Sequence, residues 1–325
     1  MDLQNKFNLG FFPTPLHQLK NLSKKFPGYQ IYIKRDDQTG LASGGNKTRK
    51  LEYLIQKALD DNCNTVITAG AQQSNHCRQT VAACAIAGLE CHLLLGGDEP
   101  KEYNGNLLLS HLLGAKIHFT GEHRKGEDIE NLKTELELEN KKVSIIPYGG
   151  SNLLGALGYV NAIKELKSQL LDQNLKIDYI FFASSSGATQ AGMMIGMDIF
   201  DLEAELIPIN IDKAGDKGFL EMVVYGLIKQ SKQYFELKKK YRKKHIPLES
   251  AYDEPGYGVL IQNEIEAIKT LAQEEGILLD PVYTGRAFYG MLDYLKKSKL
   301  KKGSNVLFWH TGGLPANFLY GKEMV

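Results

Sequence analysis

The stretch SGGNKTRKLEYL, from Ser43 to Leu54, sets a lysine between a glycine turn and a helix. Gly44 and Gly45 permit backbone angles that a Cβ would forbid, so the chain can turn tightly before Asn46, which can cap the helix. Apolar residues then recur at three- and four-residue spacing, at Leu51, Leu54, Ile55, Ala58 and Leu59. This spacing predicts an amphipathic helix with Lys47 in its first turn.

The predicted position of Lys47 favours a neutral amine. The N-terminal end of a helix is positive and repels a cation, so we expect the pKa of this lysine to be lowered. A lysine with a lowered pKa is a nucleophile, and such lysines commonly form a Schiff base with a carbonyl compound or with pyridoxal phosphate. From this stretch alone the alternative is a solvated surface lysine beside Arg49 and Lys50, because most lysines are exposed.

Composition excludes several classes of function. The chain has 325 residues, 43% of them hydrophobic, and a net charge of +1, which predicts a globular protein of two domains without a field that attracts nucleic acid or membranes. The basic run Lys238–Lys244 contains one aromatic residue, Tyr241, and not the series of interleaved rings that base stacking uses. The four cysteines show no metal-ligand spacing, so we expect reduced thiols and no metal site. With no signal-peptide pattern or membrane-spanning run, we expect a cytoplasmic protein.

Short apolar strands alternate with amphipathic helices along most of the chain. Strands are predicted at 31–37, 65–70, 90–97, 116–121, 178–186 and 305–313, and helices at 74–88, 104–115, 128–140, 157–171, 187–200 and 219 to about 242. This alternation predicts an α/β fold of mainly parallel, twisted sheets with helices on both faces. In such sheets ligands bind beyond the carboxyl ends of the strands, so the loops after strands are where a site is expected.

Two of these loops are suited to anions. In AGAQQSNH (69–76), Ser74 is a natural N-cap, and a free helix N-terminus suits a carboxylate or a phosphate. In SSSGATQAG (184–192), small residues let backbone N–H groups converge on a phosphate, with Ser185, Ser186 and Thr189 adding hydroxyl donors. The alternatives are a plain capped helix and a tight turn. The second loop matches neither a P-loop nor a dinucleotide fingerprint, so neither ATP nor NAD is indicated.

Two further regions supply rings and hydroxyls. Tyr257 lies in GYG and Tyr283 in DPVYTGRAFYG, where each tyrosine could stack on a ring or exchange protons. Each could equally be a buried aromatic residue with a satisfied hydroxyl. Thr311 lies in HTGG, directly after a buried strand, and would point its hydroxyl towards the mouth of the sheet.

Taken together, five ordered motifs resemble the pyridoxal-phosphate enzymes of the tryptophan-synthase β-like fold (fold type II). The resemblance is to the branch with D-cysteine desulfhydrase and 1-aminocyclopropane-1-carboxylate deaminase. It covers nearly the whole chain and rests on GGNKTRKLEYL, QSNHCRQ, SSSGATQAG, LLDPVYTGRAFYGM and HTGGLPA. It implies a larger cofactor-binding domain (1–51 and 161–325), a smaller α/β domain (52–160), an active site between them, and a homodimer.

The resemblance also implies roles for residues. Lys47 would carry the cofactor as a Schiff base, and Asn46 would contact the ring oxygen. The cofactor phosphate would be held by the loop residues Ser185, Ser186, Gly187, Ala188 and Thr189. The substrate carboxylate would be bound by Gln73, Ser74 and Asn75, with Ser74 also counted as catalytic. Tyr257 and Tyr283 would flank the ring and the substrate.

Two positions depart from the deaminases of this branch. Those enzymes carry a glutamate directly after the second tyrosine and a leucine in the loop after the last strand, whereas this chain has Thr284 and Thr311. A hydroxyl beside the pyridine nitrogen leaves it largely unprotonated and weakens the electron sink, which still suffices for β-elimination of a thiolate. We favour Thr311 over Thr284 for that contact.

The expected reaction is therefore conversion of D-cysteine to pyruvate, hydrogen sulfide and ammonia, with Lys47, or a tyrosine, removing the Cα proton. Alternatives within the enzymes are opening of the cyclopropane ring and elimination from another β-substituted amino acid such as cysteate. The non-enzymatic alternative is an amino-acid-binding module, against which Lys47 and both tyrosines argue.

Overall fold

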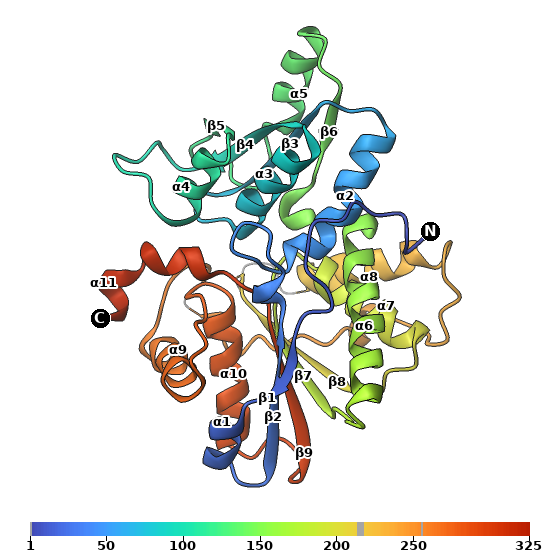
Figure 1. The fold of residues 1–325 in the computed structure, drawn as a ribbon, viewed down its shortest axis with the longest axis vertical. Helices are drawn as coiled ribbons and strands as arrows, with labels where there is room; N and C mark the ends of the chain where they lie inside the picture. Colours follow the sequence, from blue (N-terminus) through green and yellow to red (C-terminus); the bar gives the residue numbers. More distant parts are fainter. Residues whose placement is uncertain (1, 213–217, 255) are drawn as a thin grey trace.

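The computed structural model describes residues 2–212, 218–254 and 256–325, which contain two separate β-sheets (Figure 1). The larger sheet is five-stranded, in the order β1-β2-β9-β7-β8, and only β1 runs antiparallel to its neighbour. Its strands are β1 (Leu16–Gln18), β2 (Tyr29–Arg35), β7 (Tyr179–Ser184), β8 (Glu205–Asn210) and β9 (Ser304–His310). The predicted α/β class with mainly parallel sheets is confirmed.

Helices cover both faces of the larger sheet. One face packs against α1 (Lys20–Lys25), α9 (Gln262–Glu275) and α10 (Thr284–Lys296), and the other against α6 (Leu153–Asp172), α7 (Ala188–Ile199) and α8 (Phe219–Ser231). Strand β9 shows why its sequence reads as a continuous apolar run. Val306 and Phe308 face one core while Leu307 and Trp309 face the other, since successive side chains of a strand point to opposite faces.

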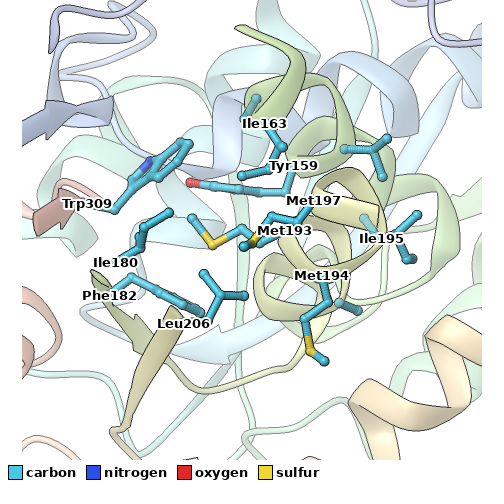
Figure 2. Packing of buried hydrophobic residues seen from close by; sticks show 14 of the residues in the cluster. Tyr159, Ile163, Ile180, Phe182, Met193, Met194, Ile195, Met197, Leu206 and Trp309 are labelled. Atoms are coloured by element: carbon cyan, nitrogen blue, oxygen red, sulfur yellow. The ribbon is translucent and has the colours of Figure 1, made fainter. Parts of the chain in front are cut away.

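The core on the α6 and α7 side is rich in flexible side chains. Figure 2 shows Trp309 and Tyr159 beside Met193 and Met197, between the sheet and the two helices. The rings of Tyr159 and Trp309 lie with centroids 5.7 Å apart. Methionine is unbranched and flexible, and is therefore suited to filling irregular gaps around such rigid rings.

The smaller sheet is four-stranded and parallel, in the order β5-β4-β3-β6, and forms the upper part of Figure 1. Its strands are β3 (Thr65–Ala71), β4 (Glu90–Gly96), β5 (Lys116–Phe119) and β6 (Val143–Ile145). One face carries α2 (Lys47–Asp60), α3 (Asn75–Ala87) and α4 (Gly105–Leu112), and the other carries α5 (Ile129–Leu138). The described parts of the chain also contain a terminal helix, α11 (Gly321–Met324), and four 3-10 turns: Asp36–Gln38, Tyr148–Gly150, Lys243–His245 and Leu314–Phe318.

Helix α2 joins the two halves. It packs on α3 of the smaller sheet and on α6 of the larger one, as Figure 1 shows. Gly158 permits the close approach of α6, because a Cβ there would lie 2.3 Å from the Arg49 carbonyl oxygen. The domain boundaries implied by the resemblance, 1–51 with 161–325 and 52–160, stay a prediction.

One predicted helix is wrong in length. A helix was expected from Phe219 to about Arg242, but α8 ends at Ser231. The Ser231 hydroxyl donates to the Ile228 carbonyl oxygen, and the basic run that begins at Lys238 would set like charges one turn apart in a helix. The segment before the turn Lys243–His245 is therefore irregular and largely exposed.

A buried carboxylate anchors the N-terminal turn of α2. Asp36 accepts from Arg49 Nε and Nη2 at 2.9 and 2.8 Å, from Tyr159 Oη and Trp309 Nε1 at 2.8 Å each, and from Thr14 Oγ1 at 2.9 Å. Burial alone would raise the pKa of Asp36, but the Arg49 guanidinium lowers it to about 2. The carboxylate therefore stays ionised and ties α2 to α6 and to the last strand.

Loss of this charge is expected to destabilise the fold strongly. We predict that Asp36→Asn lowers the free energy of unfolding by about 3–5 kcal/mol, because the buried Arg49 guanidinium loses its main counter-charge. Urea unfolding followed by circular dichroism measures this. The control is Asp201→Asn, which removes an exposed pair with Lys238 and should leave the unfolding curve almost unchanged. Equal shifts for the two variants would contradict the role given to Asp36.

Candidate active site

A cleft opens where the carboxyl ends of β3, β7 and β9 meet α2. It encloses about 630 Å³, part of it open to solvent. Its lining comes from both sheets and consists of Asn46, Lys47, Ser74, Asn75, His76, Tyr148, Gly149, Ala183, Ser184, Ser185, Ser186, Gly187, Thr189, Tyr283, Thr311 and Gly312. Most of the predicted site residues therefore meet in one place.

The glycine turn delivers Lys47 to this cleft. Gly44 and Gly45 have φ of 70° and 130°, and a Cβ on Gly44 would lie 1.9 Å from the Asp37 carbonyl oxygen. The Asn46 N–H donates to the Thr311 carbonyl oxygen at 2.9 Å, which ties the turn to the loop after the last strand. Lys47 is then the first residue of α2, as the spacing predicts, although the Asn46 side chain does not cap the helix.

Burial sets the charge of Lys47. Desolvation lowers its pKa to about 8, so burial adds to the helix-end effect on which the sequence prediction relied. The first turn of α2 contains no acidic residue that would hold the ammonium form. Lys47 Nζ donates to the Gly149 carbonyl oxygen at 3.3 Å. At neutral pH an appreciable fraction of this amine is therefore unprotonated and nucleophilic.

Lys50 is a second buried lysine, which the sequence analysis named only in the alternative of an exposed basic turn. Its Nζ donates to the same Gly149 carbonyl oxygen at 3.2 Å, and its side chain is buried. Burial, and then the charge of Lys47, lower the pKa of Lys50 well below its usual value. Its spacing of three residues from Lys47 puts both on one helix face, which was the signal available in the sequence. Only Lys47 of the two lines the cleft.

The serine loop forms an open helix N-terminus. Gly187 has φ of 90° and, as the N-cap residue of the twelve-residue helix α7, offers no side chain to cap it. The Ala188 N–H donates to Ser151 Oγ at 3.1 Å, and Ser185, Ser186 and Thr189 line the cleft around this end. Such an end, ringed by hydroxyls, fits a phosphate. Ala188 is buried, and because its N–H already donates to Ser151 Oγ, that predicted phosphate donor is engaged within the protein.

Gly149 leaves the space between this loop and the lysine. A Cβ there would lie 2.5 Å from Ser186 Oγ and 3.7 Å from Lys47 Nζ. A group bonded to Lys47 and also held by the serine loop would occupy the region that such a side chain would restrict.

The loop after β3 brings two of the three residues predicted to bind the substrate carboxylate, Ser74 and Asn75, to the cleft, but not Gln73. Ser74 caps α3 by accepting from the Cys77 N–H at 3.2 Å, and Ser74 and Asn75 both line the cleft. Gln73 is turned away from the cleft. Its Oε1 accepts from the Asn106 N–H at 2.9 Å and its Nε2 donates to the Asn104 carbonyl oxygen at 3.0 Å.

The two predicted tyrosines are hydrogen-bonded to each other. Their hydroxyl oxygens lie 2.7 Å apart, with the rings edge to face. Tyr283 lines the cleft, whereas Tyr257 lines an adjoining outer groove, where the Arg124 guanidinium lies 5.1 Å from its ring centroid. Burial raises the pKa of both phenols, so both are neutral donors at neutral pH.

The two threonines are in different surroundings. Thr311 lines the cleft. Thr284 is buried at the start of α10, where its hydroxyl donates to Asp280 Oδ1 at 2.6 Å and accepts from the Asp280 N–H at 2.7 Å. The Thr284 hydroxyl is therefore already engaged within its own helix start.

Tyr148 and His76 also line the cleft and were not singled out from the sequence. Burial raises the pKa of Tyr148 to about 12. Burial and the nearby lysines lower the pKa of His76 well below its usual value, so this imidazole is neutral. His76 Nε2 lies 2.8 Å from Thr68 Oγ1, while the buried Nδ1 has no partner among the residues that the structure describes. Most buried nitrogens in folded proteins have a hydrogen-bond partner, so this one is unusual.

The lowered pKa of Lys47 has a measurable cost in stability. We predict that Lys47→Met stabilises the cofactor-free protein at pH 7 by roughly 1–2 kcal/mol, a value discounted because the amine borders a solvent-filled cleft. Below pH 8 the amine is protonated in both the folded and the unfolded state, so the folded protein carries the full cost of burying the charge. The gain should shrink between pH 8 and pH 10.5 and then vanish.

Urea unfolding across this pH range measures the effect, with the exposed Lys301→Met as control, for which we expect less than about 0.5 kcal/mol. A gain that does not change with pH would contradict the assignment of the lowered pKa to Lys47.

Comparisons with known proteins agree with this site. A family model described as "Pyridoxal-phosphate dependent enzyme" matches residues 7–312. A Klebsiella pneumoniae (strain 342) protein named D-cysteine desulfhydrase is 40% identical over 331 residues, which cover 98% of this chain and 99% of that protein. A Pyrococcus abyssi protein provisionally named 1-aminocyclopropane-1-carboxylate deaminase is 40% identical over 315 residues, 96% of this chain and 92% of its own.

The fold is also found in a solved structure. The crystal structure of a protein described as an ACC deaminase homologue matches with a TM-score of 0.90 and 36% identity, over 98% of this chain and 95% of that one. In the part of the chain that the structure describes, no helix has the length and apolarity to cross a membrane. The family match and the shared fold agree with the lysine cleft, and the chain belongs to the family of pyridoxal-phosphate-dependent enzymes.

Proposed function

We propose that this enzyme eliminates hydrogen sulfide from D-cysteine and releases pyruvate and ammonia. One observation carries the proposal: the described lining of the cleft contains no aspartate and no glutamate, and the loop after the last strand offers the neutral hydroxyl of Thr311. Without a carboxylate to hold a proton on the pyridine nitrogen, the cofactor is a weaker electron sink. Such a site suits a substrate whose β-substituent departs with the electron pair.

The residues of the cleft fit pyridoxal phosphate. The N-terminus of α7 with Ser185, Ser186, Gly187 and Thr189 would hold the phosphate, and Lys47 would hold the aldehyde carbon. Asn46 and His76 border the same space. When bound, the cofactor supplies a sink for the electron pair left at Cα.

The chain's own residues would orient the substrate and move its proton. Ser74 and Asn75 would bind the carboxylate at the N-terminus of α3. Lys47, whose pKa is lowered to about 8, is poised to accept the Cα proton at neutral pH. The Tyr283 hydroxyl, held by Tyr257, is a neutral donor beside the cleft and would give a proton to the departing sulfur. The reaction consumes one water and balances as cysteine plus water giving pyruvate, hydrogen sulfide and ammonia.

Opening of 1-aminocyclopropane-1-carboxylate is the competing activity, since one of the compared relatives bears that name. A strained ring carries no leaving group, so its opening depends more on the sink than thiolate loss does. The homodimer and the cytoplasmic location expected from the sequence stay predictions.

The test is release of pyruvate and sulfide from D-cysteine, L-cysteine and 1-aminocyclopropane-1-carboxylate by the purified holoenzyme. We expect equal amounts of both products from D-cysteine, and little or no product from the other two. Release of 2-oxobutyrate and ammonia from the cyclopropane amino acid at a comparable rate would overturn the proposal.

A pair of variants tests the part given to Thr311. Thr311→Val keeps the shape and removes the hydroxyl, and it should lower turnover of D-cysteine about tenfold, the cost of one hydrogen bond to a buried polar partner. Thr311→Ser keeps the hydroxyl and is expected to retain most of the activity. Equal losses in the two variants would show that the hydroxyl is not what matters.

A further inference from the structure

We propose that Arg78 and Asn106 are positioning residues that orient the Asn75 amide, so that its N–H groups face the cleft and receive the substrate carboxylate. The inference rests on the proposed function only in taking Asn75 as a carboxylate ligand. It does not depend on which amino acid is the substrate. It assigns a role to two buried residues, one of which is distant in sequence from the loop that it serves.

Arg78 fixes the orientation of the Asn75 side-chain amide, because it bonds the amide oxygen. The Arg78 side chain is buried on α3, one turn after Asn75, and its Nη1 donates to Asn75 Oδ1 at 2.9 Å. A guanidinium has donors only, so the amide atom opposite it has to be the oxygen. The orientation of the amide therefore follows from the chemistry of its neighbour.

Asn106 reinforces this orientation from another helix. Arg78 Nη1 also donates to Asn106 Oδ1, which leaves Asn106 Nδ2 facing the other way. That Nδ2 donates to the Gln73 carbonyl oxygen and to Asn75 Oδ1, at 2.9 Å each. Asn75 Oδ1 thus receives two hydrogen bonds, which use both of its lone pairs.

The remaining group of Asn75 is its amide nitrogen. Asn75 lines the cleft, and its Nδ2 donates to no other residue in the described parts of the chain. A side chain held in this way presents only donors to the cleft. Together with the N-terminus of α3, it favours an anionic group over a cationic one.

Arg78 also connects this donor to the reactive lysine. Its Nη2 donates to the Gly44 carbonyl oxygen at 2.8 Å, within the turn that leads to Lys47. The next residue, Gln79, accepts from the Thr48 N–H at 2.9 Å. One helix turn therefore sets the carboxylate donor and the lysine turn at a fixed separation, as a substrate with both an amine and a carboxylate requires.

The experiment compares two amines, alanine, which has a carboxylate, and ethylamine, which has none. Holoenzyme is titrated with alanine, in both enantiomers, and with ethylamine, while the visible absorption of the bound cofactor is followed. Asn106→Leu and Asn106→Asp both remove the donor to Asn75, and the second keeps an acceptor for Arg78 and so preserves the fold. We expect both to raise the half-saturating concentration of the bound enantiomer of alanine about tenfold, and that of ethylamine by less than about twofold.

Two controls make the result specific. Ser110→Ala removes a buried hydroxyl of α4 that bonds the Asn106 carbonyl oxygen, and it should leave both titrations unchanged. In an Asn75→Ala background, the Asn106 substitutions should have no further effect on alanine, because their effect passes through Asn75. The inference is overturned if alanine and ethylamine weaken equally, if only the aspartate variant weakens alanine, or if the two positions act additively. Failure of D-cysteine as a substrate would leave these titrations readable.

Discussion

The buried carboxylate of Asp36 holds the start of α2 against the larger sheet. It receives hydrogen bonds from Arg49 on α2, Tyr159 on α6 and Trp309 on β9, so three elements that are distant in sequence meet at one charge. Lys47 lies two residues before Arg49 and inherits its position from this arrangement. An ion pair of this kind is costly to desolvate, and its value here lies in fixing geometry more than in adding stability.

The first turn of α2 also contains the two buried lysines, Lys47 and Lys50. Lys47 and Lys50 share the Gly149 carbonyl oxygen, and burial lowers the pKa of each. Two amines this close favour the loss of at least one proton, since like charges in a poorly solvated site repel. The cleft residues then divide by element: α7 offers an N-terminus for a phosphate, α3 offers one for a carboxylate, and the loop after β9 brings Thr311.

Local features were predictable from the sequence, and distant contacts were not. The glycines before Lys47, the serine cap of α3 and the small residues before α7 each impose their own backbone geometry, so the cleft could be expected at these loops. Asn106 could not be found in this way, because it reaches Asn75 from a helix thirty-one residues further along the chain. Tyr148 lies outside every motif. The distinction between Thr284 and Thr311 depends on Asp280, which bonds Thr284 from only four residues away; this local signal was present in the sequence but was not used. The length of α8 was overestimated because its apolar spacing continues into a basic segment, where Phe235, Leu237 and Tyr241 still pack on the core but the chain is no longer helical.

The most direct test of this account is to find which lysine carries the cofactor. Borohydride reduction of the holoenzyme fixes pyridoxal phosphate to the lysine that binds it, and digestion followed by mass spectrometry locates the modified residue. The account predicts a single modified site at Lys47, with Lys50 unmodified. Modification at Lys50, or at a lysine outside α2, would contradict it.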